Sequence, residues 1–100
     1  MTATKVAKTS DIPAGTGKVV EVGGRAIAVF NADGAFYAID NTCAHRGGPL
    51  GEGTLSGKTV TCPWHGWEYD VSSGACQMDA SIGVKRFDVR VEGDDILVAI

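Results

Sequence analysis

Glycine is the residue that most constrains how this chain can fold. The 100 residues include 14 glycines, which is about twice the usual share. Tight turns often require glycine, so this abundance favours many short strands over a few long helices. No segment shows a capped helical period of apolar residues over three turns, which also argues against helices. We therefore expect an all-β chain.

Glycine pairs also place the turns of the predicted sheet. Gly23 and Gly24 separate two β-rich runs, and such a pair is a strong signal for a two-residue hairpin because both positions need a positive φ. Similar turns, at Asn31–Gly34 and Glu92–Asp95, divide the other runs. The predicted strands are residues 18–22, 25–30, 35–39, 84–91 and 96–100. We expect antiparallel sheets that form a small barrel or sandwich.

The middle of the chain has a different pattern. Residues 41–53 contain four glycines and a proline, and residues 62–76 contain two tryptophans, a proline and two glycines. Neither stretch alternates cleanly between polar and apolar positions. We interpret them as two long loops, joined by a short strand pair around residues 54–55 and 59–61. Long loops in a small domain usually serve function.

These loops contain both histidines and two of the three cysteines, in two matched pairs. One pair is Cys43-Ala44-His45, and the other is Cys62-Pro63-Trp64-His65. An odd cysteine count in a chain without an export signal argues against a disulfide framework. Two metal centres fit this ligand set: a four-coordinate zinc, or a 2Fe–2S cluster with two cysteines and two histidines. Common zinc modules pair cysteine with cysteine and histidine with histidine, which these loops do not.

Residues 43–50 and 62–70 resemble the two cluster-binding loops of Rieske proteins. The similarity is to soluble Rieske-type ferredoxins and to the Rieske domains of ring-hydroxylating oxygenases, and it extends across the chain. It implies a single Rieske domain over residues 1–100. Within it, residues 1–40 and 80–100 would form a base of antiparallel sheets, and residues 41–79 an inserted cluster-binding subdomain.

The resemblance implies roles for individual residues. Cys43 and Cys62 would hold one iron, while His45 and His65 would hold the other at the solvent-exposed tip. Other residues of the two motifs would surround the cluster, with the glycines allowing backbone N–H groups to approach the sulfurs. These surrounding residues are Arg46, Gly47, Gly48, Pro49, Leu50, Trp64, Gly66, Trp67 and Tyr69.

Three departures from respiratory Rieske proteins affect the expected reduction potential. Those proteins carry one extra cysteine in each loop, joined as a disulfide, at the places where Gly48 and Trp64 stand here. Trp67 replaces a serine that donates to a bridging sulfur, whereas Tyr69 matches a tyrosine that donates to a cysteine sulfur. We therefore expect a potential toward the low end of the Rieske range of roughly −150 to +300 mV.

The remaining residues of the two loops allow plainer interpretations. Leu50, Pro63, Trp64 and Trp67 would form an apolar cover over the cluster, with docking or electron transfer as an alternative role for Trp64. Arg46 could pair with a nearby carboxylate, Glu52 or Asp70, or contact a partner. Cys76 lies outside the motif and is expected to be a small buried residue.

Other functions can be set aside on the residues present. An oxygenase needs a mononuclear iron, commonly held by two histidines and a carboxylate, and both histidines already belong to the paired motifs. A dinucleotide-binding G-x-G-x-x-G motif does not occur, which argues against a reductase. A net charge of −3 argues against nucleic-acid binding. We therefore expect an electron carrier, not an enzyme.

The leading prediction is a cytoplasmic, monomeric ferredoxin that relays electrons from a flavin-dependent NAD(P)H reductase to a terminal oxygenase, without membrane contact. A nitrite reductase small subunit is an alternative of similar size and fold. A structural zinc module and a regulatory iron–sulfur sensor are alternatives of other classes. The acidic excess, −3 over residues 40–79, either favours a basic docking partner or is merely solvated.

Overall fold

The computed structural model describes residues 3–43, 48–64, 66–77 and 81–99. The regular secondary structure in these ranges is nearly all β, as expected, apart from two short 3-10 helices, η1 (Thr9–Asp11) and η2 (Leu50–Glu52). The strands are β1 (Ala3–Lys8), β2 (Thr16–Val22), β3 (Arg25–Ala32), β4 (Ala35–Asp40), β5 (Thr54–Ser56), β6 (Thr59–Thr61), β7 (Glu68–Asp70), β8 (Arg86–Glu92) and β9 (Asp95–Ala99). None of the described helices is long and apolar enough to cross a membrane.

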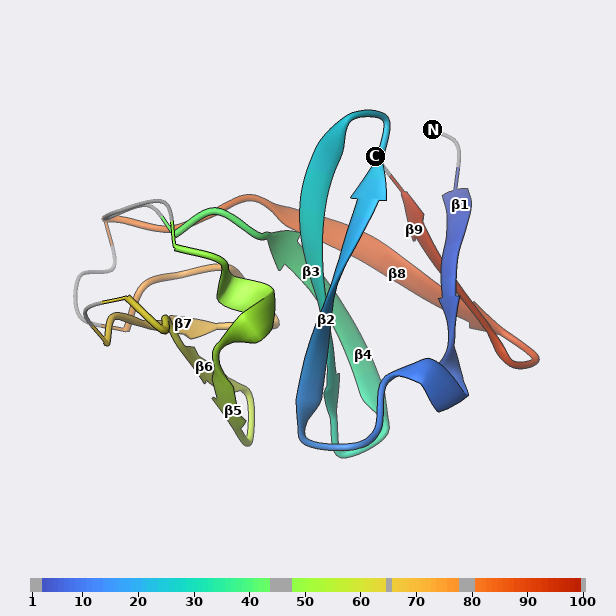
Figure 1. Cartoon of the computed structure of the whole chain (residues 1–100), viewed down its shortest axis with the longest axis horizontal. Coiled ribbons are helices and arrows are strands. Elements are labelled where there is room, and N and C mark those ends of the chain that lie inside the picture. Colours follow the sequence, from blue (N-terminus) through green and yellow to red (C-terminus); the bar gives the residue numbers. More distant parts are fainter. Residues whose placement is uncertain (1–2, 44–47, 65, 78–80, 100) are drawn as a thin grey trace.

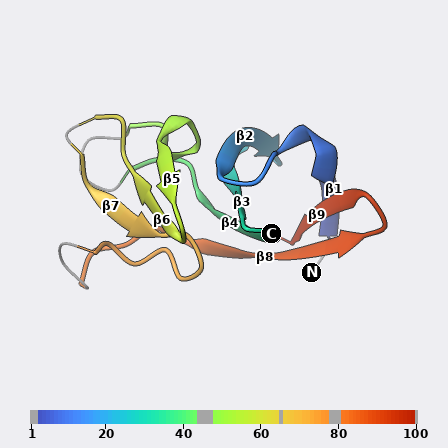
Figure 2. The ribbon, with the colours of Figure 1, turned by 90° about the horizontal axis from the view of Figure 1, so that it is seen from below.

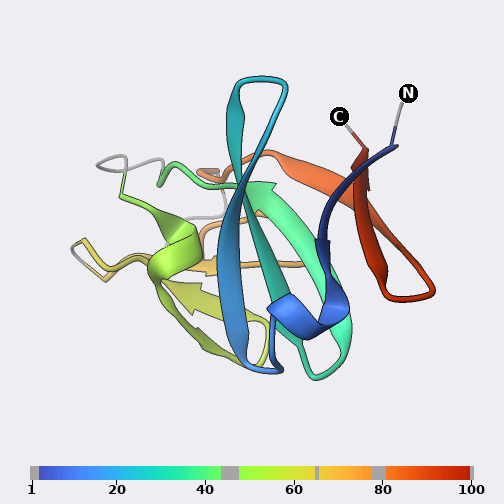
Figure 3. The same ribbon diagram turned by 45° about the vertical axis from the view of Figure 1, so that its right-hand side comes forward.

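Two antiparallel sheets make up the architecture (Figure 1). The base sheet has six strands in the order β1-β9-β8-β4-β3-β2, and the small sheet has three in the order β5-β6-β7. The base sheet curls until its two edge strands, β1 and β2, approach each other, which gives a nearly closed barrel (Figure 3). A barrel-like base is one of the two architectures that the sequence predicts.

The glycine turns confirm the predicted hairpins. Gly23 and Gly24 both have positive φ, 59° and 80°, and they connect β2 to β3 with Val22 opposite Arg25. Asp33 and Gly34, with φ of 54° and 92°, form the next turn, between β3 and β4. Two-residue turns of this kind match the right-handed twist of the strands that they join.

Two strands were not predicted. Residues 3–8 form β1, which pairs with β9 at the opposite end of the chain, with an irregularity between Lys5 and Ala7. Residues 68–70 form β7, inside the stretch expected to be a loop. The partner of β1 lies at the far end of the sequence. β7 is only three residues long, so its pattern is too short to recognise.

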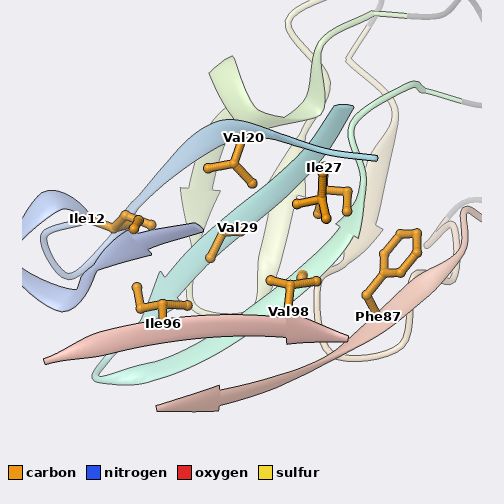
Figure 4. Packing of buried hydrophobic residues seen from close by; sticks show 10 residues of the cluster. Ile12, Val20, Ile27, Val29, Phe87, Ile96 and Val98 are labelled. Carbon is orange, nitrogen blue, oxygen red and sulfur yellow. The ribbon is translucent and has the colours of Figure 1, made fainter. Parts of the chain in front are cut away.

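The barrel interior holds an aliphatic core (Figure 4). Residues from all six strands of the base sheet meet there, and Ile27, Val29, Ile96 and Val98 are fully buried. Burial of each such side chain contributes about 1.5–3 kcal/mol to folding.

A second core lies between the base sheet and the small sheet, which stand beside each other in Figure 2. Strand β3 serves both cores because its side chains alternate between its two faces. Ile27 and Val29 enter the barrel, whereas Ala28 and Phe30 enter the second core. This double burial explains the unbroken apolar run in β3, and it anchors the small sheet to the barrel.

Candidate metal centre

Two short turns carry the cysteines of the paired motifs. The Cys43 N–H donates to the Gly48 carbonyl at 2.9 Å, which closes the first turn. The Cys62 N–H donates to the Trp67 carbonyl at 2.7 Å, which closes the second. Each cysteine therefore lies at the base of a turn that its own amide holds closed, and both side chains are only 2% exposed.

The expected histidine ligands, His45 and His65, are outside the described residues, and so are Arg46 and Gly47. The roles of His45 and His65 thus stay predictions. Among the residues that the structure does describe, no three potential metal ligands cluster together.

The two cysteine thiols are close neighbours in the second core. Burial is the main cause that raises the pKa of the Cys62 thiol, and the adjacent Cys43 raises it further. The Trp64 N–H donates to the Cys62 sulfur at 3.4 Å, and this hydrogen bond acts in the opposite direction on that pKa.

Tyr69 reaches the other sulfur from strand β7. Its hydroxyl lies 3.2 Å from the Cys43 Sγ, as the resemblance implies, and its side chain is fully buried. The phenol can donate its O–H when that sulfur is a thiolate. Two buried sulfurs, each within hydrogen-bond distance of an O–H or N–H group, fit the thiolate half of an iron–sulfur centre.

The glycines expected near the cluster are favoured at their positions for different reasons. Gly66 has a φ of 75° and open space around its Cα, so its backbone conformation is what favours glycine. Gly48 lacks a positive φ, yet a Cβ there would lie 2.8 Å from the Cys62 sulfur. Steric room is therefore the reason at position 48, and Gly47 is outside the described ranges.

The residues of the expected apolar cover differ in their exposure. Leu50 is fully buried, and Trp67 is half-buried in the second core. Pro63 and Trp64, by contrast, are exposed, Trp64 to 50%. The indole of Trp64 is thus half exposed, and its role as cover or docking contact stays a prediction.

The segment after the first turn is also fixed by Asn41, which the sequence analysis did not single out. Its side-chain oxygen accepts the Gly51 N–H at 2.8 Å, and its carbonyl accepts the Leu50 N–H at 2.7 Å. Pro49 lies between these contacts and the turn, in an isolated bridge with Thr42. The signal was an asparagine between a strand and a glycine-rich loop, a common place for side-chain to backbone bonds.

Cys76 is confirmed as a small buried residue. It is 2% exposed, it packs in the second core, and its backbone forms an isolated bridge with Tyr69. Asp70, a suggested partner of Arg46, accepts hydrogen bonds from both the backbone and the hydroxyl of Ser72.

A barrel-like base sheet, a small sheet beside it and two cysteine turns define a class of iron–sulfur protein. The model of the Rieske [2Fe-2S] domain family matches residues 2–97, so the chain belongs to this family. Its cofactor is accordingly a Rieske-type 2Fe–2S cluster, which replaces the zinc alternative.

The curated proteins similar to this chain include ferredoxins. The ferredoxin component of the naphthalene 1,2-dioxygenase system of Pseudomonas aeruginosa is 32% identical over 88% of this chain and 86% of its own length. Ferredoxin CarAc of Metapseudomonas resinovorans is 35% identical over 95% of this chain and 91% of its own length.

Solved structures give the same result. The ferredoxin of carbazole 1,9a-dioxygenase from Nocardioides aromaticivorans IC177 superposes with a TM-score of 0.91 at 30% identity, covering 99% of this chain and 98% of that one. A complex of reduced oxygenase and oxidized ferredoxin in carbazole 1,9a-dioxygenase holds a chain with a TM-score of 0.88 at 34% identity, covering 97% of this chain and 92% of that one. A nitrite reductase small subunit, at 21% identity and a TM-score of 0.86 over the full length of both chains, shares the fold alone.

Proposed function

We propose that this chain is a Rieske ferredoxin, a one-electron carrier that is not itself an enzyme. It takes electrons from an NAD(P)H-dependent flavin reductase and passes them to a terminal oxygenase. The observation that carries the proposal is the pair of buried, adjacent cysteines at the bases of two turns, in a chain whose relatives are ferredoxin components of dioxygenase systems.

In this proposal the four residues of the paired motifs are the cluster ligands. Cys43 and Cys62 bind one iron through their sulfurs, and His45 and His65 bind the other. The bound cluster supplies a centre that gains and loses one electron. The Tyr69 hydroxyl and the Trp64 amide, placed at the two cysteine sulfurs, donate hydrogen bonds that stabilise negative charge on them.

We also propose that the chain is a single domain, with residues 41–79 as a cluster-binding subdomain inserted in a base of residues 1–40 and 80–100. The support is strand β3, whose alternate side chains belong to both cores. The monomeric state and the cytoplasmic location expected from the sequence stay predictions.

The terminal oxygenase is the acceptor best supported. A ferredoxin of similar sequence has been captured in a complex with the oxygenase of carbazole 1,9a-dioxygenase. Glu52 and Glu68 are exposed on the described surface, without an ion pair there, whereas Asp40 lies near Arg25 and Asp70 is bonded to Ser72. Among the described acidic residues of positions 40–79, these two glutamates are available to a basic partner.

The proposed ligands can be tested with the three cysteines, which provide their own control. Cys43→Ala and Cys62→Ala, purified without air, should lose the visible absorbance and the reversible one-electron bleaching of the wild-type protein. Cys76→Ala should keep both, because this equally buried cysteine is not a ligand. A redox-active cluster that survives either of the first two substitutions would contradict the assignment.

The acceptor is tested by rapid mixing of the reduced protein with the oxidised oxygenase of carbazole 1,9a-dioxygenase. Reoxidation of this chain within seconds, slowed by added salt, is expected for an acidic carrier and a basic docking face. A rate that does not depend on salt would contradict the basic partner. If the reduced protein is not reoxidised at all, the proposal of an acceptor of this oxygenase class is contradicted.

A further inference from the structure

One glycine touches both of the cysteines proposed as ligands. The Gly48 carbonyl accepts the Cys43 N–H at 2.9 Å, and a Cβ at this position would lie 2.8 Å from the Cys62 sulfur. The same Cβ would lie 3.0 Å from Cγ and 3.1 Å from Cβ of Trp64. Gly48 is therefore the point at which the first turn meets the second.

No backbone requirement explains this glycine. Its φ lies outside the left-handed region, so an alanine could adopt the same backbone conformation. What an alanine lacks is room, because its neighbours are a sulfur on a short side chain and the first two atoms of an indole side chain. Those atoms cannot swing aside as the far end of a long side chain could.

We propose that Gly48 is a positioning residue of the metal centre. Because position 48 has no side chain, there is room beside it for the Cys62 sulfur and for the Cβ and Cγ of Trp64. The close approach keeps the Trp64 amide within hydrogen-bond distance of that sulfur, 3.4 Å, while the Gly48 carbonyl fixes Cys43. This inference rests on the proposed function, since it takes the two cysteines as the iron ligands.

As a consequence, the effects of substitutions at positions 48 and 64 should depend on each other. Any side chain at position 48 would compete for space with the Cβ and Cγ of Trp64. A methyl group at position 48 must displace the sulfur, the tryptophan or the backbone that holds Cys43. Each displacement alters the geometry around a cysteine sulfur.

The test compares Gly48→Ala with Gly17→Ala. Position 17 is equally crowded, because its Cβ would lie 2.5 Å from the Phe30 ring, a member of the same core, but it does not touch a sulfur. Both variants should unfold at a lower temperature than the wild type. Gly48→Ala alone should lower the midpoint potential, through the weakened hydrogen bond to the sulfur. It should also release iron to a chelator about tenfold faster, as expected for overpacking of this size.

A double variant tests the shared volume. In Gly48→Ala/Trp64→Ala the indole no longer fills the space beside position 48, so the combined effect on iron release should be smaller than the product of the two single effects. Equal potentials for Gly48→Ala, Gly17→Ala and the wild type would overturn the proposal, and so would strictly multiplicative effects in the double variant. A wild-type protein that binds no cluster would instead refute the proposed function.

Discussion

The two sheets of this protein are stabilised in different ways. The base sheet has six strands of five to eight residues, and it encloses an aliphatic core. The small sheet has three strands of three residues each, and its core contains all three cysteines and Tyr69. Sheets this short contribute little stability by themselves. The small sheet therefore depends on packing against β3 and on the metal centre that its loops carry.

The largest effect should follow removal of the iron. Metal binding stabilises the site that holds it, so loss of the cluster should lower the opening free energy of the small sheet far more than that of the barrel. We expect amide hydrogen exchange in β5–β7 to quicken at least about 100-fold, and exchange in β3 and β9 to change by less than about threefold.

Hydrogen exchange of the iron-free and iron-loaded proteins, followed by mass spectrometry, provides the measurement. Equal acceleration in both sheets would show that the two regions open together, and the contrast between them would then be wrong.

Substitutions at two adjacent residues of β3 can distinguish the contributions of the two cores to stability and to iron binding. Phe30→Ala should destabilise the protein by about 4 kcal/mol and Val29→Ala by about 2 kcal/mol, because both side chains are fully buried. Phe30 faces the second core and Val29 the barrel, so only Phe30→Ala should accelerate iron release. Urea unfolding and chelator kinetics measure the two effects.

Val91→Ala provides a control for these variants, since Val91 is 47% exposed. This substitution should lower the free energy of unfolding by no more than about 0.5 kcal/mol. Iron release that accelerates equally in Val29→Ala and Phe30→Ala would mean that the barrel core also controls the metal centre.

The smallest predicted effect concerns one hydrogen bond. Tyr69→Phe removes the hydroxyl that lies 3.2 Å from the Cys43 sulfur. The reduced state carries one more negative charge and gains more from this bond, so its loss should lower the midpoint potential. A differential of about 1 kcal/mol corresponds to about 40 mV for one electron.

Potentiometric titration followed by visible absorbance measures that shift. Tyr37→Phe is the matched control, because Tyr37 packs at the margin of the same core, and its ring lies under the Lys58 ammonium. A shift of equal size in both variants would remove the specific role of the Tyr69 hydroxyl.

Much of the fold was predictable because the turns are encoded locally. Gly23-Gly24 and Asp33-Gly34 occupy positive-φ positions that few other residues tolerate, so four residues suffice to place a hairpin. The apolar run of β3 indicated a buried strand, but not that its two faces serve different cores. β1 was missed because its hydrogen-bond partner, β9, lies at the far end of the chain.

The candidate metal centre, like the fold, was predictable from the sequence only in part. Residue types and spacing singled out the cysteine–histidine pairs, and the resemblance implied that Tyr69 donates to a cysteine sulfur. The structure places its hydroxyl 3.2 Å from the Cys43 sulfur. Spacing alone could not show that Gly48 lies against the Cys62 sulfur, that Asn41 fixes the segment after the first turn, or that Trp64 is half exposed.

By itself, the sequence determined the all-β class, the hairpin turns and the chemistry of the ligand set, because these depend on backbone freedom at single positions and on the identity of side chains. The tertiary structure decided which strands close the barrel, which glycine contacts a sulfur and which tryptophan faces solvent. Those features depend on packing between segments that are distant in the chain, and no local pattern encodes the distance between two such segments.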